Sequence, residues 1–193
     1  MKRPYTLGRR AEQQEITRRR IVEAAVELHS SLGPGRTPIS MVADRAGVQR
    51  HTLYAHFPDE RSLYLACSGL AFERDPLPGA EAWHAIKSPR ERLRVGLRAI
   101  YGWYERNAGL VACALRDAEY HALTREIAAL KYGPQMTTYY EVLGKTLTKR
   151  QRPILCLALS FFTWRTLVLE TGLKQEAAVL AMVQAIAAAQ IRR

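Results

Sequence analysis

The stretch that most constrains the fold of this chain is Thr37–Leu63, TPISMVADRAGVQRHTLYAHFPDERSL. Gly47 lies near its middle and favours a helix end, because glycine adopts positive φ without strain. After it, Leu53 and Phe57 share one face of a second short helix. Two short helices joined by a tight turn form a helix-turn-helix, which lays its second helix in the major groove of DNA. Before the glycine, four apolar residues recur at helical spacing: Ile39, Val42, Ala43 and Ala46.

The first helix of the motif is expected to start with Thr37 as its cap and Pro38 in its first turn. The N-terminal part of the second helix should reach the base edges. Arg50 is the first candidate there, because its guanidinium can bind guanine O6 and N7 together. Gln49 caps helices poorly and is expected to face DNA. The side chains that should point away from the apolar face of this helix are His51, Thr52, Tyr54 and Ala55.

A helix from about Thr17 to Ser31 is expected to precede the motif, with Arg18, Arg19 and Arg20 in its first turn. Cations at a helix N-terminus interact unfavourably with the helix dipole, so three arginines at this position suggest a function. Contact with DNA phosphates is one reason, and a solvated run of charge is the alternative. Residues 1–15 are expected to form a flexible basic arm, which either lies along DNA or is a disordered tail.

The motif resembles the DNA-binding domain of the TetR (tetracycline-repressor) family of bacterial regulators. The resemblance implies phosphate contacts by Tyr54 and His56, and a backbone contact by Thr37. Family members usually carry a phosphate-contacting lysine at the position of Glu60. Arg61 beside it is a further DNA-binding candidate, but neighbours on a helix point about 100° apart, so it is not an automatic substitute for that lysine. The residues that carry the resemblance are Thr37, Ile39, Val42, Ala43, Ala46, Gly47, Val48, Thr52, Leu53, Tyr54, His56, Phe57 and Leu63.

Composition excludes several classes of protein. The chain of 193 residues is 48% hydrophobic and carries a formal charge of +11, which favours a polyanionic partner such as DNA. Its three cysteines lack paired spacing, so neither a disulfide framework nor a zinc site is expected. No metal-ligand pattern or Gly-rich phosphate loop is present, so no catalytic residue, metal or cofactor is predicted. The N-terminus has no apolar run of a signal peptide, and Ile154–Leu169 is short for a membrane span and contains Arg165. A cytoplasmic protein is expected.

Helical patterns continue to the end of the chain, which predicts an all-α fold of about nine helices. Residues 16–74 form the DNA-binding domain, including a connecting helix from Asp59 to about Arg74. Pro and Gly in residues 75–88 indicate the boundary with a C-terminal domain, 75–193. Its expected helices begin after a Ser88 cap and then cover 110–118, 119–147 with a break at Gly133-Pro134, 153–170 and 174–189.

The resemblance implies that the C-terminal domain holds a small-molecule pocket and a dimer interface formed by its last two helices. Large side chains and possible polar anchors supply candidates, although aromatic residues at helical spacing also suit a core, and internal ion pairs would explain the arginines. The pocket candidates are Tyr101, Tyr104, Arg116, His121, Tyr140, Phe161, Phe162, Trp164 and Arg165. The interface candidates are Leu159, Leu167, Val179, Met182, Val183 and Ile186.

Together these features predict a ligand-responsive regulator, most simply a repressor that binds a palindromic operator as a homodimer and is released by an effector. A sequence-tolerant DNA-binding protein without effector control is the alternative. An enzyme is a distant third, because Cys113 and His121 would form a dyad only if the fold brought them together.

Overall fold

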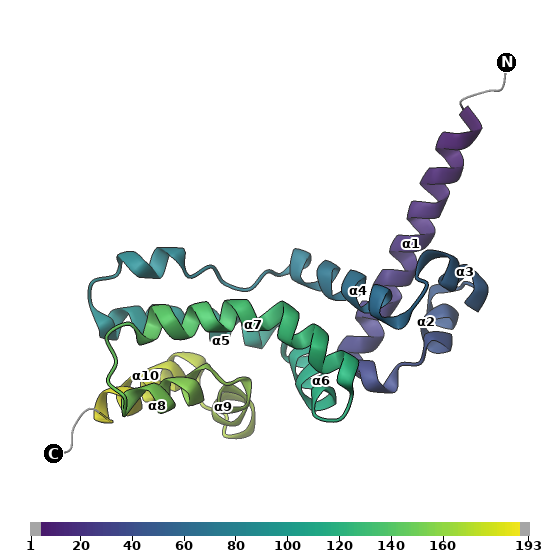
Figure 1. The fold of residues 1–193 in the computed structure, drawn as a ribbon. Helices are drawn as coiled ribbons and strands as arrows, with labels where there is room; N and C mark the ends of the chain where they lie inside the picture. The colour runs from purple at the N-terminus through teal and green to yellow at the C-terminus, as the bar shows by residue number, and fades with distance from the viewer. Residues whose placement is uncertain (1–4, 190–193) are drawn as a thin grey trace. The chain divides into compact units, whose positions relative to one another are not determined.

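The computed structural model describes residues 5–189, and every regular element in that range is helical, which confirms the all-α prediction (Figure 1). The elements are α1 (Tyr5–Ser31), η1 (Pro34–Arg36), α2 (Ile39–Ala46), α3 (Arg50–His56), α4 (Glu60–Arg74), η2 (Glu81–Ala85), α5 (Pro89–Arg106), α6 (Ala108–Ala118), α7 (Ala122–Gly144), α8 (Gln151–Leu159), α9 (Phe161–Arg165), η3 (Thr166–Glu170) and α10 (Gln175–Ala188).

The chain divides into two compact units. The described residues up to Pro76 form the first unit together with Cys113–Ala128, and the second unit takes Leu77–Ala112 and the described residues from Ala129 onward. The division at Pro76 falls inside the predicted boundary. It was not predicted that residues 113–128 belong to the first unit. These residues are the end of α6, the turn after it and the start of α7, and they join the DNA-binding helices in that unit.

In the first unit, α1 packs against α2, α3 and α4. The core between them is apolar, and Ile21, Ala25 and Leu53 are fully buried in it. Helix α1 begins at Tyr5, so residues 5–15 are helical rather than the predicted flexible arm, and residues 1–4 lie outside the described range. The run from Ala11 to Glu15 consists of strong helix formers, which explains the longer helix (Figure 1).

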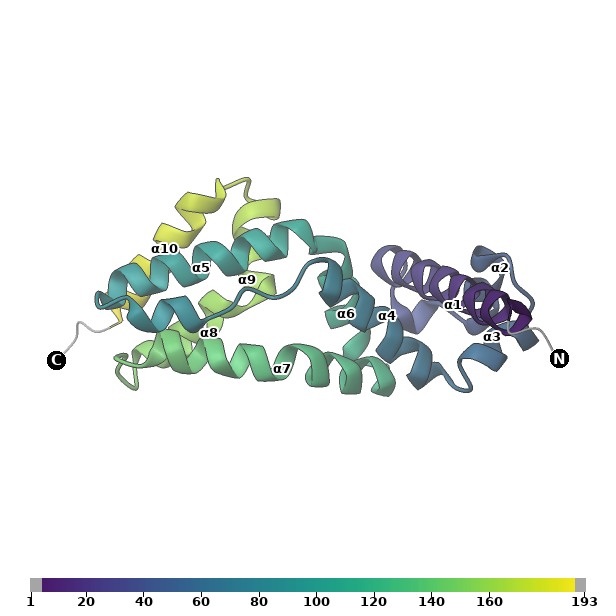
Figure 2. The ribbon, with the colours of Figure 1, turned by 90° about the horizontal axis from the view of Figure 1, so that it is seen from above.

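In the second unit, α10 packs against α5 and α8 (Figure 2). Trp83 of η2 is buried beside Tyr139 of α7, with ring centroids 5.2 Å apart. Helix α7 continues through Gly133-Pro134, where a break was expected. Pro134 is exposed, so its ring lies on the solvent side of the helix, and the next turn gains a hydrogen bond from the Thr137 hydroxyl to the Gly133 carbonyl.

The predicted single helix over 153–170 is instead broken at Ser160. Its two parts, α8 and α9–η3, meet at an angle of 68°. Ser160 ends α8 and caps α9, and its hydroxyl accepts a hydrogen bond from the Phe162 N–H at 3.2 Å. Among residues 5–189, no single helix has the length and apolar character of a membrane span, and only this bent pair passes such a test, on length and composition alone.

Candidate nucleic-acid interface and regulatory unit

The helix-turn-helix forms as predicted. Helix α2 ends at Gly47, which adopts the left-handed conformation at φ 63° and ψ 40°. Leu53 and Phe57 are buried, with exposed fractions of 0% and 1%, so α3 is held against the core of the first unit by the expected face.

The start of α2 differs from the prediction. Pro38 is the cap residue, and no side chain caps the helix. The Thr37 hydroxyl donates instead to the Gly33 carbonyl at 2.7 Å, because α2 begins two residues later, at Ile39, and Thr37 still belongs to the preceding loop. Thr37 therefore stabilises the entry to the motif.

The outward face of α3 carries the predicted reading residues. Gln49 is its N-terminal cap residue and makes no side-chain capping bond. The exposed candidates are Gln49, Arg50, His51 and Tyr54, while Thr52 and His56 are half-buried. This face presents one cation, hydrogen-bonding groups and an aromatic ring to the outside of the unit.

The three arginines of α1 have different environments. The guanidinium of Arg18 lies 4.7 Å from the centre of the Phe57 ring, just beyond the C-terminal end of α3. Arg20 donates to the Gly47 carbonyl at 3.5 Å, in the turn before α3. Arg19 pairs with Glu23 of its own helix at 3.3 Å. Arg18 and Arg20 thus flank the two ends of α3.

Arg61 of α4 forms an ion pair with a residue outside the helix-turn-helix. Its Nε donates to the Glu126 carboxylate of α7 at 2.8 Å, and both side chains are about half exposed. An exposed ion pair is weak and does not by itself lock the side chain, so contact of Arg61 with DNA stays a prediction.

Four of the predicted pocket residues gather in the second unit. Tyr104, Phe161 and Trp164 lie within ring-centroid distances of 5.3 to 6.0 Å of one another, and Tyr101 adjoins Tyr104 at 6.4 Å. The Tyr101 and Tyr104 hydroxyls donate to the carbonyls of Ala158 and Leu159, at 2.9 and 2.7 Å, and burial raises the pKa of both. The indole N–H of Trp164 is buried and, within the described range, has no hydrogen-bond acceptor.

Of the other pocket candidates, Phe162 lies at the edge of this cluster, with its ring centroid 5.9 Å from that of Phe161, and the rest lie elsewhere. Arg116 and His121 belong to the first unit, where Arg116 pairs with Asp117 and His121 Nδ1 lies 2.8 Å from the Thr124 hydroxyl. Phe162 is exposed, and Arg165 pairs with Glu170 at 3.0 Å. The remaining candidate, half-buried Tyr140, lies under the guanidinium of Arg152.

Most of the predicted dimer-interface residues are buried inside their own chain. Val179, Val183 and Ile186 of α10 and Leu159 of α8 are buried, whereas Leu167 and Met182 are half-buried. The interface prediction is corrected for the four buried side chains, which face α5 and the rest of the second-unit core. The large apolar residues that α8, α9, η3 and α10 leave exposed are Leu157, Phe162, Leu169 and Leu180.

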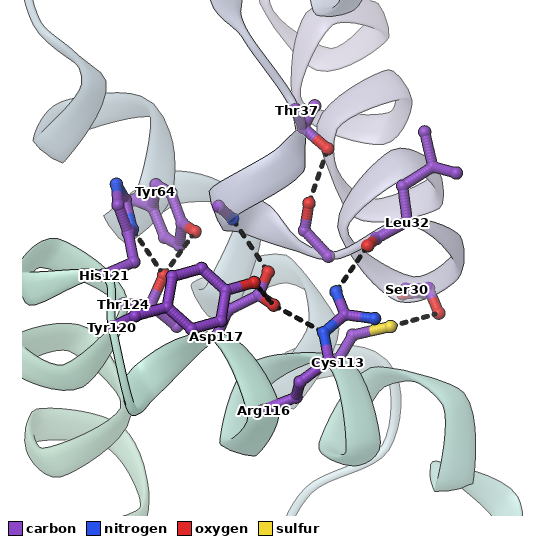
Figure 3. Close-up of polar contacts among 12 residues, drawn as sticks. Ser30, Leu32, Thr37, Tyr64, Cys113, Arg116, Asp117, Tyr120, His121 and Thr124 are labelled. Atoms are coloured by element: carbon purple, nitrogen blue, oxygen red, sulfur yellow. Dashed lines mark hydrogen bonds and ion pairs between the residues drawn. The ribbon is translucent and has the colours of Figure 1, made fainter.

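Sequence reasoning missed a polar network in the first unit (Figure 3). Asp117 is completely buried and accepts hydrogen bonds from the Gly35 N–H and the Tyr120 hydroxyl. Next to it, the Tyr64 and Thr124 hydroxyls are 2.9 Å apart. The only signal in the sequence is the Gly33-Pro34-Gly35 loop, whose glycines leave room for a close partner. Within the described range, no group of three or more His, Cys, Asp or Glu side chains could hold a metal ion.

Comparison with known proteins agrees with this geometry. Residues 21–67 match the family model described as bacterial regulatory proteins, tetR family. A search of curated proteins finds no significant match.

Solved structures share the fold over most of the chain. A TetR-like transcriptional regulator from Rhodococcus sp. RHA1 is 20% identical with a TM-score of 0.61, over 88% of this chain and 93% of that one. A TetR transcription regulator from Haloarcula marismortui is 14% identical with a TM-score of 0.55, over 91% and 96%. A protein from Saccharomonospora viridis solved in complex with choline is 18% identical with a TM-score of 0.53, over 90% and 95%.

The family match covers the helix-turn-helix, and the shared fold extends over the rest of the chain. The regulators of this family are transcription factors rather than enzymes. Residues 21–67 are thus a DNA-binding domain of the TetR-family type, and the chain as a whole has the fold of TetR-like transcriptional regulators.

Proposed function

We propose that this regulator binds a palindromic operator as a homodimer and is released from it by a small-molecule effector. The observation that carries the proposal is the outward face of α3, where Arg50 and Tyr54 are exposed while Leu53 is fully buried. An exposed helix face of this kind fits the major groove, and Arg50 near its start is placed to reach a base edge.

The phosphate contacts come from residues around α3. Arg18 and Arg20 flank its two ends, so they can bind the backbone on either side of the groove. With Glu60 at the usual lysine position and Arg61 turned to Glu126, these arginines carry more of the electrostatic attraction than the start of α4 does. Tyr54, His56 and Gln49 supply further hydrogen-bonding contacts. Because chromosomal DNA is the partner, the protein acts in the bacterial cytoplasm.

The homodimer forms through the outer face of α8 and α10. Leu157 and Leu180 are exposed there, with exposed fractions of 56% and 38%. Around Leu180, α10 leaves four alanines exposed or half-buried at helical spacing, together with Gln184: Ala177, Ala181, Ala187 and Ala188. Small side chains allow close approach of a second helix, and a two-fold dimer matches the symmetry of a palindrome.

The effector site is the aromatic cluster of the second unit. Its rings offer apolar contacts, and the Trp164 indole N–H offers a donor without an acceptor in the described chain. A buried donor costs free energy until it is paired, so an effector with a hydrogen-bond acceptor gains affinity by pairing it. Aromatic walls also attract organic cations such as the choline found in the Saccharomonospora viridis protein. Repression is then relieved because the effector binds more tightly to the form that does not bind DNA.

Arg50→Ala and Tyr54→Phe separate sequence reading from backbone contact. Arg50→Ala is expected to relax preference at one base pair of each half-site, by about 1–3 kcal/mol, because it removes a contact to a base edge. Tyr54→Phe removes only a hydroxyl and is expected to weaken binding to all sequences alike. Titration of operator and single-base variants by fluorescence anisotropy measures both. An Arg50→Ala protein with an unchanged base preference would remove this residue from the reading set.

The alternative function, sequence-tolerant DNA binding, uses the same basic surface. It predicts that neither variant changes base preference, because the wild-type protein would have none. The charge of +11 is compatible with either function, so the ratio of specific to non-specific affinity decides between them.

A further inference from the structure

The loop between α1 and α2 has a backbone that few sequences could form. It contains Gly33-Pro34-Gly35 and ends at Thr37, one residue before the cap of α2. Gly33 has φ 97° and ψ 151°, a conformation that glycine adopts and residues with a Cβ atom rarely do. The path of the chain into α2 therefore depends on what holds this loop.

A buried carboxylate and its neighbours hold the loop from the turn between α6 and α7 (Figure 3). Asp117 accepts hydrogen bonds from the Gly35 N–H at 2.8 Å, the Tyr120 hydroxyl at 2.5 Å and the Arg116 Nε at 2.7 Å. Arg116 also donates to the Leu32 carbonyl at 2.6 Å. We call these contacts of Asp117 and Arg116 with residues 32–35 the loop clamp.

The carboxylate of Asp117 is charged at neutral pH despite its burial. Burial by itself raises the pKa of Asp117, but the hydrogen bonds from Arg116, Tyr120 and Gly35 outweigh it and hold the pKa below its ordinary value. Hydrogen bonds to a charged acceptor are stronger than those between neutral groups, so the bond to Gly35 is a strong link to the loop.

The glycines of the loop are matched to this clamp. A Cβ atom on Gly33 would lie 2.2 Å from Arg116 Nη2 and 2.3 Å from Asp117 Oδ2. A Cβ atom on Gly35 would lie 3.2 Å from the Tyr120 ring. At Gly33 this close approach requires the absence of a side chain, and at Gly35 a Cβ atom would require the Tyr120 ring to move by a few tenths of an ångström.

Packing alone does not fix the loop. A cavity of about 220 Å³ borders it, lined by the loop residues and by His29, Tyr64 and His121. On the side of this cavity the loop is not held by packed side chains, so the bonds of the clamp add what packing does not supply there.

We infer that Asp117 and Arg116 are positioning residues for DNA binding, which hold the α1–α2 loop and thereby α2 and α3 in the geometry that fits the major groove. This inference rests on the proposed DNA-binding function. Asp117 lies 82 residues from Gly35 and outside the reading helix, so its effect on DNA is transmitted through the loop. Both α6 and α7 continue into the second unit, so a change in either helix reaches the motif through the same bonds.

Asp117→Asn tests the inference, since it keeps the side chain's shape and removes its charge. We expect operator affinity to fall about tenfold or more, as one charge-assisted hydrogen bond is lost. Hydrogen exchange followed by NMR should show faster exchange of the Gly35 amide, while the amides in the middle of α1 keep their protection. Arg116→Gln is the milder variant if Asp117→Asn folds poorly, because Arg116 is partly exposed and its loss frees the Leu32 carbonyl.

Arg125→Gln is the matched control. Arg125 donates to the carbonyls of Ala118 and Glu119 at the same turn but makes no bond to the loop, so operator affinity should stay within about twofold. Equal affinity of wild type and Asp117→Asn, or faster exchange of all first-unit amides together, would overturn the inference and leave the proposed function standing. A wild-type protein without sequence preference would instead contradict the proposed function itself.

Discussion

Leu157→Glu and Leu180→Glu are each expected to convert the dimer to monomers at concentrations where the wild type is dimeric. Each change places a carboxylate twice in a symmetric apolar interface, and burying an unpaired charge costs several kcal/mol. The dimer dissociation constant should therefore rise about a hundredfold or more. Operator affinity should fall by a similar factor, because each monomer binds only one half-site. Sedimentation velocity measures the first effect and anisotropy with full and half operators the second.

Leu130→Glu provides the control for these two variants. Leu130 lies on α7 and is 53% exposed, close to the 56% of Leu157, but it lies outside the proposed interface. It should leave both the dimer and operator affinity unchanged. If the Leu157 and Leu180 variants remained dimeric, the interface would lie elsewhere on the chain.

His29→Leu is expected to flatten the pH dependence of stability between pH 4 and 6.5. His29 is 4% exposed, stacks on Tyr64 at 4.7 Å, and has Nδ1 3.4 Å from Cys67 Sγ. Burial lowers the pKa of His29 to about 4, while Asp117 raises it and His121 lowers it by smaller amounts. In the unfolded chain the histidine titrates near its ordinary pKa of about 6.5.

The sign of this effect follows from proton binding. Between pH 4 and 6.5 the unfolded chain binds a proton that the folded chain does not, so stability decreases as the pH falls through this window. The contribution of His29 is fully present above pH 6.5, and about 3 kcal/mol of it is lost by pH 4. Urea unfolding followed by circular dichroism at one protein concentration, from pH 4 to 7.5, measures the slope. His84→Gln, at an exposed histidine, should keep the wild-type slope, and a wild-type slope in His29→Leu would refute the assignment.

Local patterns were sufficient for the DNA-binding motif. Leu53 and Phe57 are four residues apart, a spacing that places them on the same side of α3 and its C-terminal cap. Gly47 ends α2 in the left-handed conformation, which glycine adopts readily. Both features follow from residues that are close together in the sequence. The same reasoning failed at Thr37. A threonine before Pro38 suits a helix cap, but it suits equally well a loop position whose hydroxyl donates to the carbonyl of Gly33, four residues earlier.

Long-range partners could not be read from the sequence. Asp117 contacts Gly35 across 82 residues, and no local pattern distinguishes this carboxylate from a solvated one. The inward face of α10 was also ambiguous, since the helix is apolar on nearly every side, with Leu180 and several alanines beside Val179 and Val183, and α5 and α8 decide which face is covered. Ser160 is a small polar residue inside an apolar run, and only the structure shows that it ends one helix and caps the next.

The central claim is that the outward face of α3 reads DNA sequence. It is tested most directly by selecting the wild-type protein's preferred sites from random DNA and comparing their affinity with that of random DNA at one moderate salt concentration. We predict a two-fold symmetric site that is bound about a thousandfold or more tightly than random DNA. No enriched sequence, with an affinity ratio near one, would contradict it.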